Sequence, residues 1–230
     1  PSLGNTEFGA YHVRYDSRLP YISGKISVDS NPPFPDYYVD YPEDIKLYGL
    51  SMNTNVPGGW SIGAEYSFRE NMPLQWNAWE LITGGLGQPY SQLFQQETGG
   101  AASPASPEAQ ALQGKEVDGY DRFKVSQAQA TFIKFFDRVL GASRLSFVGE
   151  VGMTYVHDLP EQSEASYGRS GIYGIRDFEN GVGLTGATTS CAEENDNPTN
   201  CSSDGFVSDF SWGYRLRGTL TYNNAFMGAT

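Results

Sequence analysis

Residues Trp60 to Arg69 read WSIGAEYSFR, a run in which apolar and polar side chains alternate without interruption. Because successive side chains of a β-strand leave on opposite faces, this strand has one apolar face and one face of small, polar or charged residues. Ten residues are about the length that a strand tilted by roughly 45° needs to cross a bilayer. A half-buried strand of an aqueous sheet alternates in the same way but is usually shorter. The apolar positions are Trp60, Ile62, Ala64, Tyr66 and Phe68.

Five further segments have a strand pattern, over residues 7–15, 44–53, 121–135, 145–157 and 211–222. The segment 121–135 alternates poorly, so its two faces stay unassigned. In the first strand we expect Gly9, Tyr11, Val13 and Tyr15 on the apolar face and Ala10, His12 and Arg14 on the other. The last strand alternates as clearly as residues 60–69 do.

The connections between these strands alternate between long and short. We expect long loops at residues 16–43, 70–120 and 158–208, and short connections at 54–59 and 136–144. Structureless loops of this length are improbable inside a compact soluble domain. They are ordinary in outer-membrane barrels, which carry long loops at one end and short turns at the other. The pattern therefore predicts an all-β fold, an antiparallel transmembrane β-barrel segment with long extracellular loops.

About six strands are fewer than the eight of the smallest usual bacterial barrel, so we expect further strands beyond these 230 residues. Residues 1–230 are then part of one barrel. Within the loop at 70–120, Leu74, Ala78, Leu81 and Ile82 predict a short amphipathic helix. Together with Trp76 and Trp79, this segment has three possible places: a hydrophobic gate, the membrane surface, or a contact with the barrel wall.

Composition limits the partners. The net charge of −12 argues against nucleic acid, which needs a basic surface. A mean hydropathy of −0.45 does not exclude a membrane barrel, because only every second residue of its strands meets lipid. The aromatic content of 14% suits a protein with many rings at membrane interfaces. We expect outer-membrane lipid and lipopolysaccharide as neighbours, and the bacterial outer membrane as the location.

The loop at 158–208 is acidic and contains both cysteines. It contains nine acidic residues and only two arginines. Cys191 and Cys201 lie ten positions apart with no nearby histidine, which favours a disulfide in an oxidising compartment over a metal site or free thiols. The acidic run at 193–197 lacks the ligand spacing of a calcium loop, so a solvated loop is the favoured interpretation.

Charged side chains on the polar faces are the candidate lumen lining, and the apolar faces are the candidate lipid contact. Inward charges must pair or hydrate in any barrel, so a structural role is favoured over solute selection. Arg215 and Arg217 share a face and are the best candidates for holding an anionic head group. The lumen candidates are Arg14, Glu65, Arg69, Glu150, Arg215 and Arg217. The lipid-facing candidates are Trp60, Ile62, Phe147, Val151, Trp212, Leu216 and Leu220.

Catalytic signals are weak. His12 and His157 accompany no nucleophile motif, and residues 168–171 (GRSG) miss the G-x-S-x-G spacing by one position. We therefore expect a protein that is not an enzyme, with no catalytic residue, no cofactor and no bound metal.

Three longer runs carry a family resemblance: FFDRVLGASRLSFVGEVGMTYV (135–156), YGRSGIYG (167–174) and SWGYRLRGTLTYNNAF (211–226). They resemble the Gram-negative outer-membrane proteins grouped as domain of unknown function 1302, and residues 41–54 and 58–75 look like an earlier part of the same pattern. The resemblance implies a large outer-membrane barrel, often encoded beside a periplasmic lipoprotein-like partner and an exporter of the resistance-nodulation-division type. It implies no catalytic residues.

The function expected from these observations is a conduit or docking component for the transport of lipids, steroids or other hydrophobic compounds. A scaffolding barrel with a plugged lumen is the first alternative. A secreted soluble β-sandwich that binds carbohydrate is the second. An outer-membrane esterase is the third, and it requires a serine and a histidine that the fold brings together.

Overall fold

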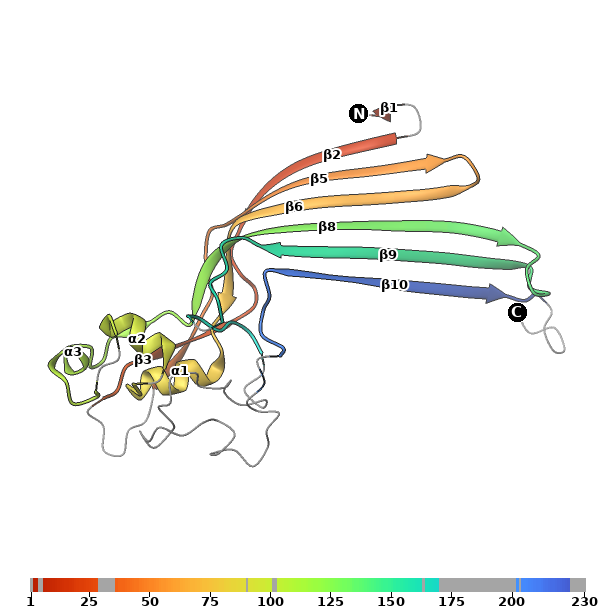
Figure 1. Ribbon diagram of the computed structural model, residues 1–230. Helices are drawn as coiled ribbons and strands as arrows, with labels where there is room; N and C mark the ends of the chain where they lie inside the picture. Colours follow the sequence, from red (N-terminus) through yellow and green to blue (C-terminus); the bar gives the residue numbers. More distant parts are fainter. Residues whose placement is uncertain are drawn as a thin grey trace.

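A computed structural model describes residues 2–3, 6–28, 36–89, 91–100, 103–162, 164–169, 202 and 204–223 of the 230. Two antiparallel sheets form in this part of the chain, and the larger one extends as a long curved surface from a smaller body at one end (Figure 1). Among the described residues, no helix has the length and apolar character to cross a membrane.

The larger sheet has seven strands in the order β1-β2-β5-β6-β8-β9-β10, and each strand is antiparallel to its neighbours. In the described residues it is open, with β1 at one edge and β10 at the other. The prediction of an antiparallel all-β fold is confirmed. The strands are β1 (Ser2–Leu3), β2 (Thr6–Tyr15), β5 (Ile45–Val56), β6 (Trp60–Gln75), β8 (Tyr120–Asp137), β9 (Arg144–Val156) and β10 (Phe210–Thr221).

Strand β6 continues six residues beyond Arg69, where alternation in the sequence stops. Arg69 lies opposite Val125, but Met72 lies opposite Phe123, so β6 has one extra residue in this interval. Such a β-bulge interrupts the alternation of side chains between the two faces without ending the pairing of the strands. The predicted end of this strand was therefore wrong, because the sequence pattern was lost at the bulge.

The three long connections all leave from the same end of the sheet, and in their described parts they fold together into a subdomain. It contains a three-stranded sheet in the order β4-β3-β7 and three short helices (Figure 1). The loops predicted at 16–43 and 70–120 therefore contain short strands and helices, whereas the described part of 158–208 contains no helix or strand. The elements are β3 (Tyr21–Lys25), β4 (Asp36–Asp40), β7 (Glu116–Val117), α1 (Ala78–Gly85), α2 (Gln92–Thr98) and α3 (Pro107–Gln110).

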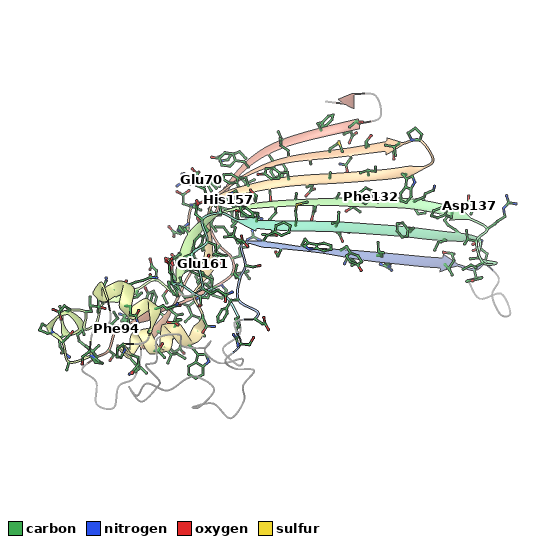
Figure 2. All side chains as sticks on the ribbon, viewed as in Figure 1. Glu70, Phe94, Phe132, Asp137, His157 and Glu161 are labelled. Carbon is green, nitrogen blue, oxygen red and sulfur yellow. The ribbon has the colours of Figure 1, made fainter. Side chains whose placement is uncertain are left out.

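Residues from all three connections make the hydrophobic core of this subdomain. Ile26 comes from the first, Trp76 and Phe94 from the second, and Tyr167 from the third, and each is at least nine-tenths buried. Phe94 has no exposed surface and lies among the helices in Figure 2. Because apolar burial is the main favourable term in folding, this core fixes the three connections relative to one another.

Helix α1 confirms the predicted helix, although Leu74 belongs to β6. Asn77 caps it, with its Oδ1 accepting a hydrogen bond of 3.0 Å from the backbone N–H of Trp79. Leu81 packs into the subdomain core beside Trp76, whereas Trp79 and Ile82 are 36% and 41% exposed. The described part of this segment therefore packs mainly on its own subdomain.

Strand registers fix which side chains share a face of the large sheet, because directly opposed residues point the same way. Leu50 pairs with Tyr66, and Ala64 with Ala130, which places Ala128, Ala130 and Phe132 of β8 on the apolar face. The face predicted for β2 was wrong. Tyr11 pairs with Gly49 on the polar side, whereas Ala10 and His12 pair with Leu50 and Tyr48 on the apolar side.

Candidate functional site

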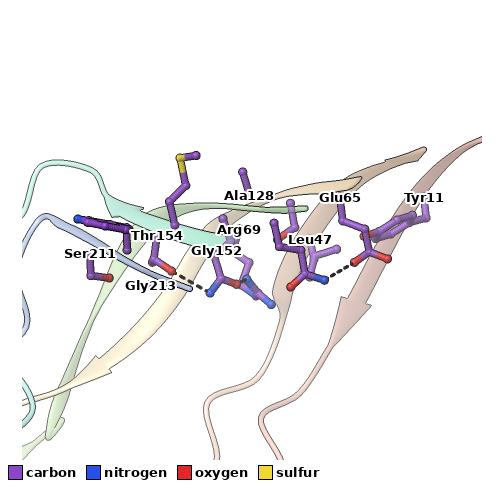
Figure 3. A pocket seen from close by; sticks show the side chains of 14 residues that line it. Tyr11, Leu47, Glu65, Arg69, Ala128, Gly152, Thr154, Ser211 and Gly213 are labelled. Carbon is purple, nitrogen blue, oxygen red and sulfur yellow. Dashed lines mark hydrogen bonds between the residues drawn. The ribbon is translucent and has the colours of Figure 1, made fainter. Parts of the chain in front are cut away.

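The polar face of the sheet carries a hydrogen-bond network at the end nearest the subdomain. Arg69 on β6 donates from Nε to the Tyr15 hydroxyl at 3.3 Å and from a terminal nitrogen to the side-chain oxygen of Gln127. Gln127 then donates to Thr154 Oγ1 at 3.2 Å (Figure 3). The network therefore links four strands, and among the described residues Arg69 is hydrogen-bonded and forms no ion pair.

Two further polar-face contacts involve predicted site residues. Gln129 donates to Glu65 Oε2 at 3.2 Å, and a terminal nitrogen of Arg215 lies 2.8 Å from Glu150 Oε2. Arg217 lies two residues along the same face, opposite Val148, and forms no ion pair with another described residue. Since Arg215 is balanced by Glu150, Arg217 is the less compensated cation of the proposed pair.

This face is hollowed between the strands, with a volume of about 430 Å³. The lining includes apolar residues such as Leu47, and its polar part combines charges, amides, a hydroxyl and a phenol: Tyr11, Glu65, Arg69, Gln127, Gln129 and Thr154 (Figure 3). Such a surface suits water and polar groups, since every charged or amide side chain on it makes or offers hydrogen bonds.

Arg14 does not belong to this face. Its partner in the register is Lys46, and both share the face of Tyr48 and Leu50 near the subdomain end. Arg14 forms an ion pair with Asp44, directly before β5. Its assignment to the same face as Glu65 and Arg69 was wrong, because β2 has large apolar side chains at both odd and even positions, and only pairing with β5 decides between them. Cys191 and Cys201, and the acidic run 193–197, lie outside the described residues.

The opposite face is apolar and exposed over the same strands. Leu50 is 59% exposed, Leu216 62% and Trp212 66%. Registers place all seven predicted lipid-facing residues on this one side: Trp60, Ile62, Phe147, Val151, Trp212, Leu216 and Leu220. A contiguous exposed apolar surface marks a membrane or a partner contact, since water disfavours it.

The structure brings together a serine and a histidine that the sequence did not connect. Ser126 Oγ lies 2.9 Å from His157 Nε2 and 3.1 Å from the Tyr66 hydroxyl. The imidazole packs edge-on against the rings of Phe68 and Tyr155. Within the described residues no carboxylate contacts His157, so this dyad lacks the third group that orients a catalytic base. It lies where the sheet meets the subdomain (Figure 2).

Two tyrosine–carboxylate pairs join the sheet to the subdomain. The Tyr167 hydroxyl donates to Asp121 at 2.6 Å, and the Tyr120 hydroxyl donates to Asp40 at 2.9 Å. Burial and the Asp121 carboxylate both raise the pKa of Tyr167, because both disfavour the phenolate. The pKa of Tyr120 rises to about 12, mainly through burial and then through Asp40. Both phenols are therefore donors at neutral pH.

Comparison with models of protein families finds one that matches residues 1–230, described as "Protein of unknown function (DUF1302)". The match covers the whole chain and confirms the resemblance seen in the sequence. No curated protein and no solved structure matches the chain. Roles for individual residues therefore rest on the geometry described above.

Proposed function

The chain belongs to the family described as "Protein of unknown function (DUF1302)", and on that premise we propose that its large sheet is part of the wall of an outer-membrane β-barrel. The apolar face contacts lipid and the polar face lines the lumen. The barrel acts as a conduit or docking component for lipids, steroids or other hydrophobic compounds.

The exposed apolar face is the observation that carries this proposal. Rows of side chains such as Met52, Ala64, Ala130, Val151 and Tyr214 continue across five paired strands. A sandwich would cover such a surface with a second sheet. The smaller sheet instead lies within the subdomain, beyond the end of the strands (Figure 1).

Strand length supports the same environment. An aromatic row at the subdomain end includes Phe68 and Tyr155, and a second row at the turn end includes Trp60 and Phe147. Eight residues separate Phe68 from Trp60 on β6, about 26 Å along the strand at roughly 3.3 Å per residue. Outer-membrane barrels have an apolar band about 25 Å tall between aromatic girdles. At the tilt of roughly 35–45° of barrel strands, the two rows lie about 20 Å apart along the barrel axis, which is within about 5 Å of the height of such a band.

The lengths of the connections support one orientation of the sheet in the membrane. The β5–β6 and β8–β9 connections are short and lie at one end, whereas the long connections gather at the other. In outer-membrane barrels short turns face the periplasm and long loops face outward. The subdomain is then extracellular, and the turn end faces the periplasm, where a lipoprotein-like partner and an exporter can dock.

Reconstitution tests transport directly. We expect the protein to conduct ions in planar bilayers, and we expect cells without it to take up less labelled steroid or lipid. Arg217→Glu reverses a lumen charge that has no described ion-pair partner, so it should shift selectivity toward cations. Arg138→Glu, in the exposed β8–β9 turn, is the matched control.

Two other outcomes would replace this proposal, and a third would correct the role of Arg217. A closed lumen with normal uptake in the deleted strain would favour the scaffolding role. Retention in the aqueous fraction without detergent would favour a soluble β-sandwich. Equal selectivity changes from Arg217→Glu and Arg138→Glu would place Arg217 outside the conduction path.

A further inference from the structure

The apolar face carries a lysine at its turn end. Lys134 of β8 lies opposite Trp60 on β6 and Phe147 on β9. Its ammonium nitrogen is 5.1 Å from the ring centroid of Trp60 and 4.8 Å from that of Phe136, within the range of cation–π attraction. No carboxylate of the described chain forms an ion pair with it. The rings therefore hold a cation that has no counter-charge in the part of the chain that the structure describes.

A hollow in the apolar face begins at the same rings. It has a volume of about 570 Å³, and its lining includes Trp60, Phe147, Ile62, Phe132 and Leu216. In the register, Trp60 and Phe147 flank Lys134, the row of Ile62, Phe132 and Leu216 comes next, and Val151 follows toward mid-strand. The Trp60 and Phe147 rings meet edge to face with centroids 6.0 Å apart. Glu150 also borders the hollow, but its carboxylate pairs with Arg215 on the polar face, so the hollow is an apolar groove with a cation at one end.

We propose that Lys134 and this groove bind an anionic phospholipid of the leaflet at the turn end. The phosphate contacts the ammonium group, and one acyl chain lies along the groove. This inference rests on the proposed function, since it requires the apolar face to be in lipid. It adds a specific lipid site to a wall that otherwise contacts lipid without preference.

The charge of the turn favours an anionic over a zwitterionic head group. Between residues 134 and 144 there are three basic residues, Lys134, Arg138 and Arg144, and one acidic residue, Asp137. Arg144 lies 3.2 Å from Asp137 and balances it. Lys134 and the exposed Arg138 remain as net positive charge. A zwitterionic head group would bring its own cation into this field, which an anionic head group does not.

A lysine at a membrane interface can also extend toward water with no lipid partner. Lipid preference separates these two cases, because a solvated lysine selects no head group. The groove separates the two cases in a second way, because an acyl chain bound there would lie against the Trp60 indole.

The experiment uses the protein in nanodiscs with equal amounts of phosphatidylglycerol and phosphatidylcholine, followed by native mass spectrometry of the lipids it retains. We expect retention of phosphatidylglycerol, and a loss of about fivefold in its preference in Lys134→Gln, the effect of one cation near an anionic surface. Lys124→Gln is the matched control, because Lys124 lies on the same strand at the opposite end. Brominated phosphatidylglycerol should quench Trp60 emission, obtained as the difference from Trp60→Phe, more than brominated phosphatidylcholine does.

The outcomes separate this inference from the proposed function. Insertion with the same lipid preference in Lys134→Gln and the unaltered protein would overturn the lipid site and leave the barrel intact. Preferential retention of phosphatidylcholine, or of added lipopolysaccharide, would also overturn it. Failure to insert into nanodiscs at all would overturn the proposed function.

Discussion

Placing a lysine at Ala130 tests the assignment of the two faces most directly. Ala130 lies on the apolar face of β8, opposite Ala64 and Val151. It is four residues from Ser126, in the aromatic row at the subdomain end, and four from Lys134, in the row at the turn end. Each interval is about 13 Å at roughly 3.3 Å per residue. Ala130 is therefore at the middle of the apolar band.

A lysine here has no route to water. Its side chain spans about 6 Å, roughly half the distance to either rim, so it cannot extend its ammonium group beyond the band as interfacial lysines do. Lysine at the midplane of a barrel costs about 2–4 kcal/mol of folding free energy. We expect Ala130→Lys to destabilise the protein by this amount.

Thr131→Lys is the matched control. Thr131 is the next residue of β8, lies on the polar face, and has Gly63 and Glu150 as partners in the register. A lysine there meets water and a carboxylate, so the change should stay within about 0.5 kcal/mol, as for most surface substitutions. The free energy of unfolding in lipid vesicles, from urea titrations followed by tryptophan fluorescence, measures both variants. Equal costs, or a larger cost for Thr131→Lys, would refute the face assignment.

Three smaller predictions concern the subdomain and its junction with the sheet. Trp76→Ala removes a side chain that is 2% exposed and should destabilise the subdomain by about 3–5 kcal/mol in thermal melts. The raised pKa of Tyr167 contributes stability that is complete below pH 10.0, its ordinary pKa, and is lost as the pH rises above it; Tyr167→Phe should remove that alkaline loss from near-ultraviolet circular dichroism titrations. Because His157 has no described carboxylate partner, Ser126→Ala should leave hydrolysis of p-nitrophenyl esters at the background rate; a measurable loss would revive the esterase alternative.

The strands could be predicted from the sequence because their pattern is local. Predicted segments 44–53, 145–157 and 211–222 agree with β5, β9 and β10 to within three residues at each end. An apolar position recurs at every second residue there, and a strand in this kind of sheet needs nothing else to define its faces. In two strands, β8 and β2, apolar side chains do not keep to one face. β8 carries Val125, Ile133 and Phe135 on its polar face, and β2 carries Phe8 and Tyr11 on opposite faces.

The subdomain could not be predicted, because the apolar residues of its core follow no regular spacing in the sequence. Ile26, Trp76 and Tyr167 come from three connections that are far apart in the sequence, and they meet in one hydrophobic core. Gln75 illustrates the same point, since its side chain pairs with both the N–H and the carbonyl of Ile22, 53 positions away. Contacts of this kind follow only from strand pairing, which brings the three connections to one end.

The two ends of the sheet are therefore stabilised by different contacts. At the turn end, each hairpin closes through a short connection and its own hydrogen bonds. At the other end, β3 pairs with β7 and packs near α1, so residues from the first two connections form one body. Tyr167 joins the third connection to this body through Trp76, with the two ring centroids 5.0 Å apart.

Because non-local contacts must wait for loop closure, the subdomain core should form after the strands have paired. Trp76→Ala should then speed the unfolding of the subdomain and leave the rate of sheet formation unchanged. Slower sheet formation in that variant would instead place the subdomain core in the folding nucleus.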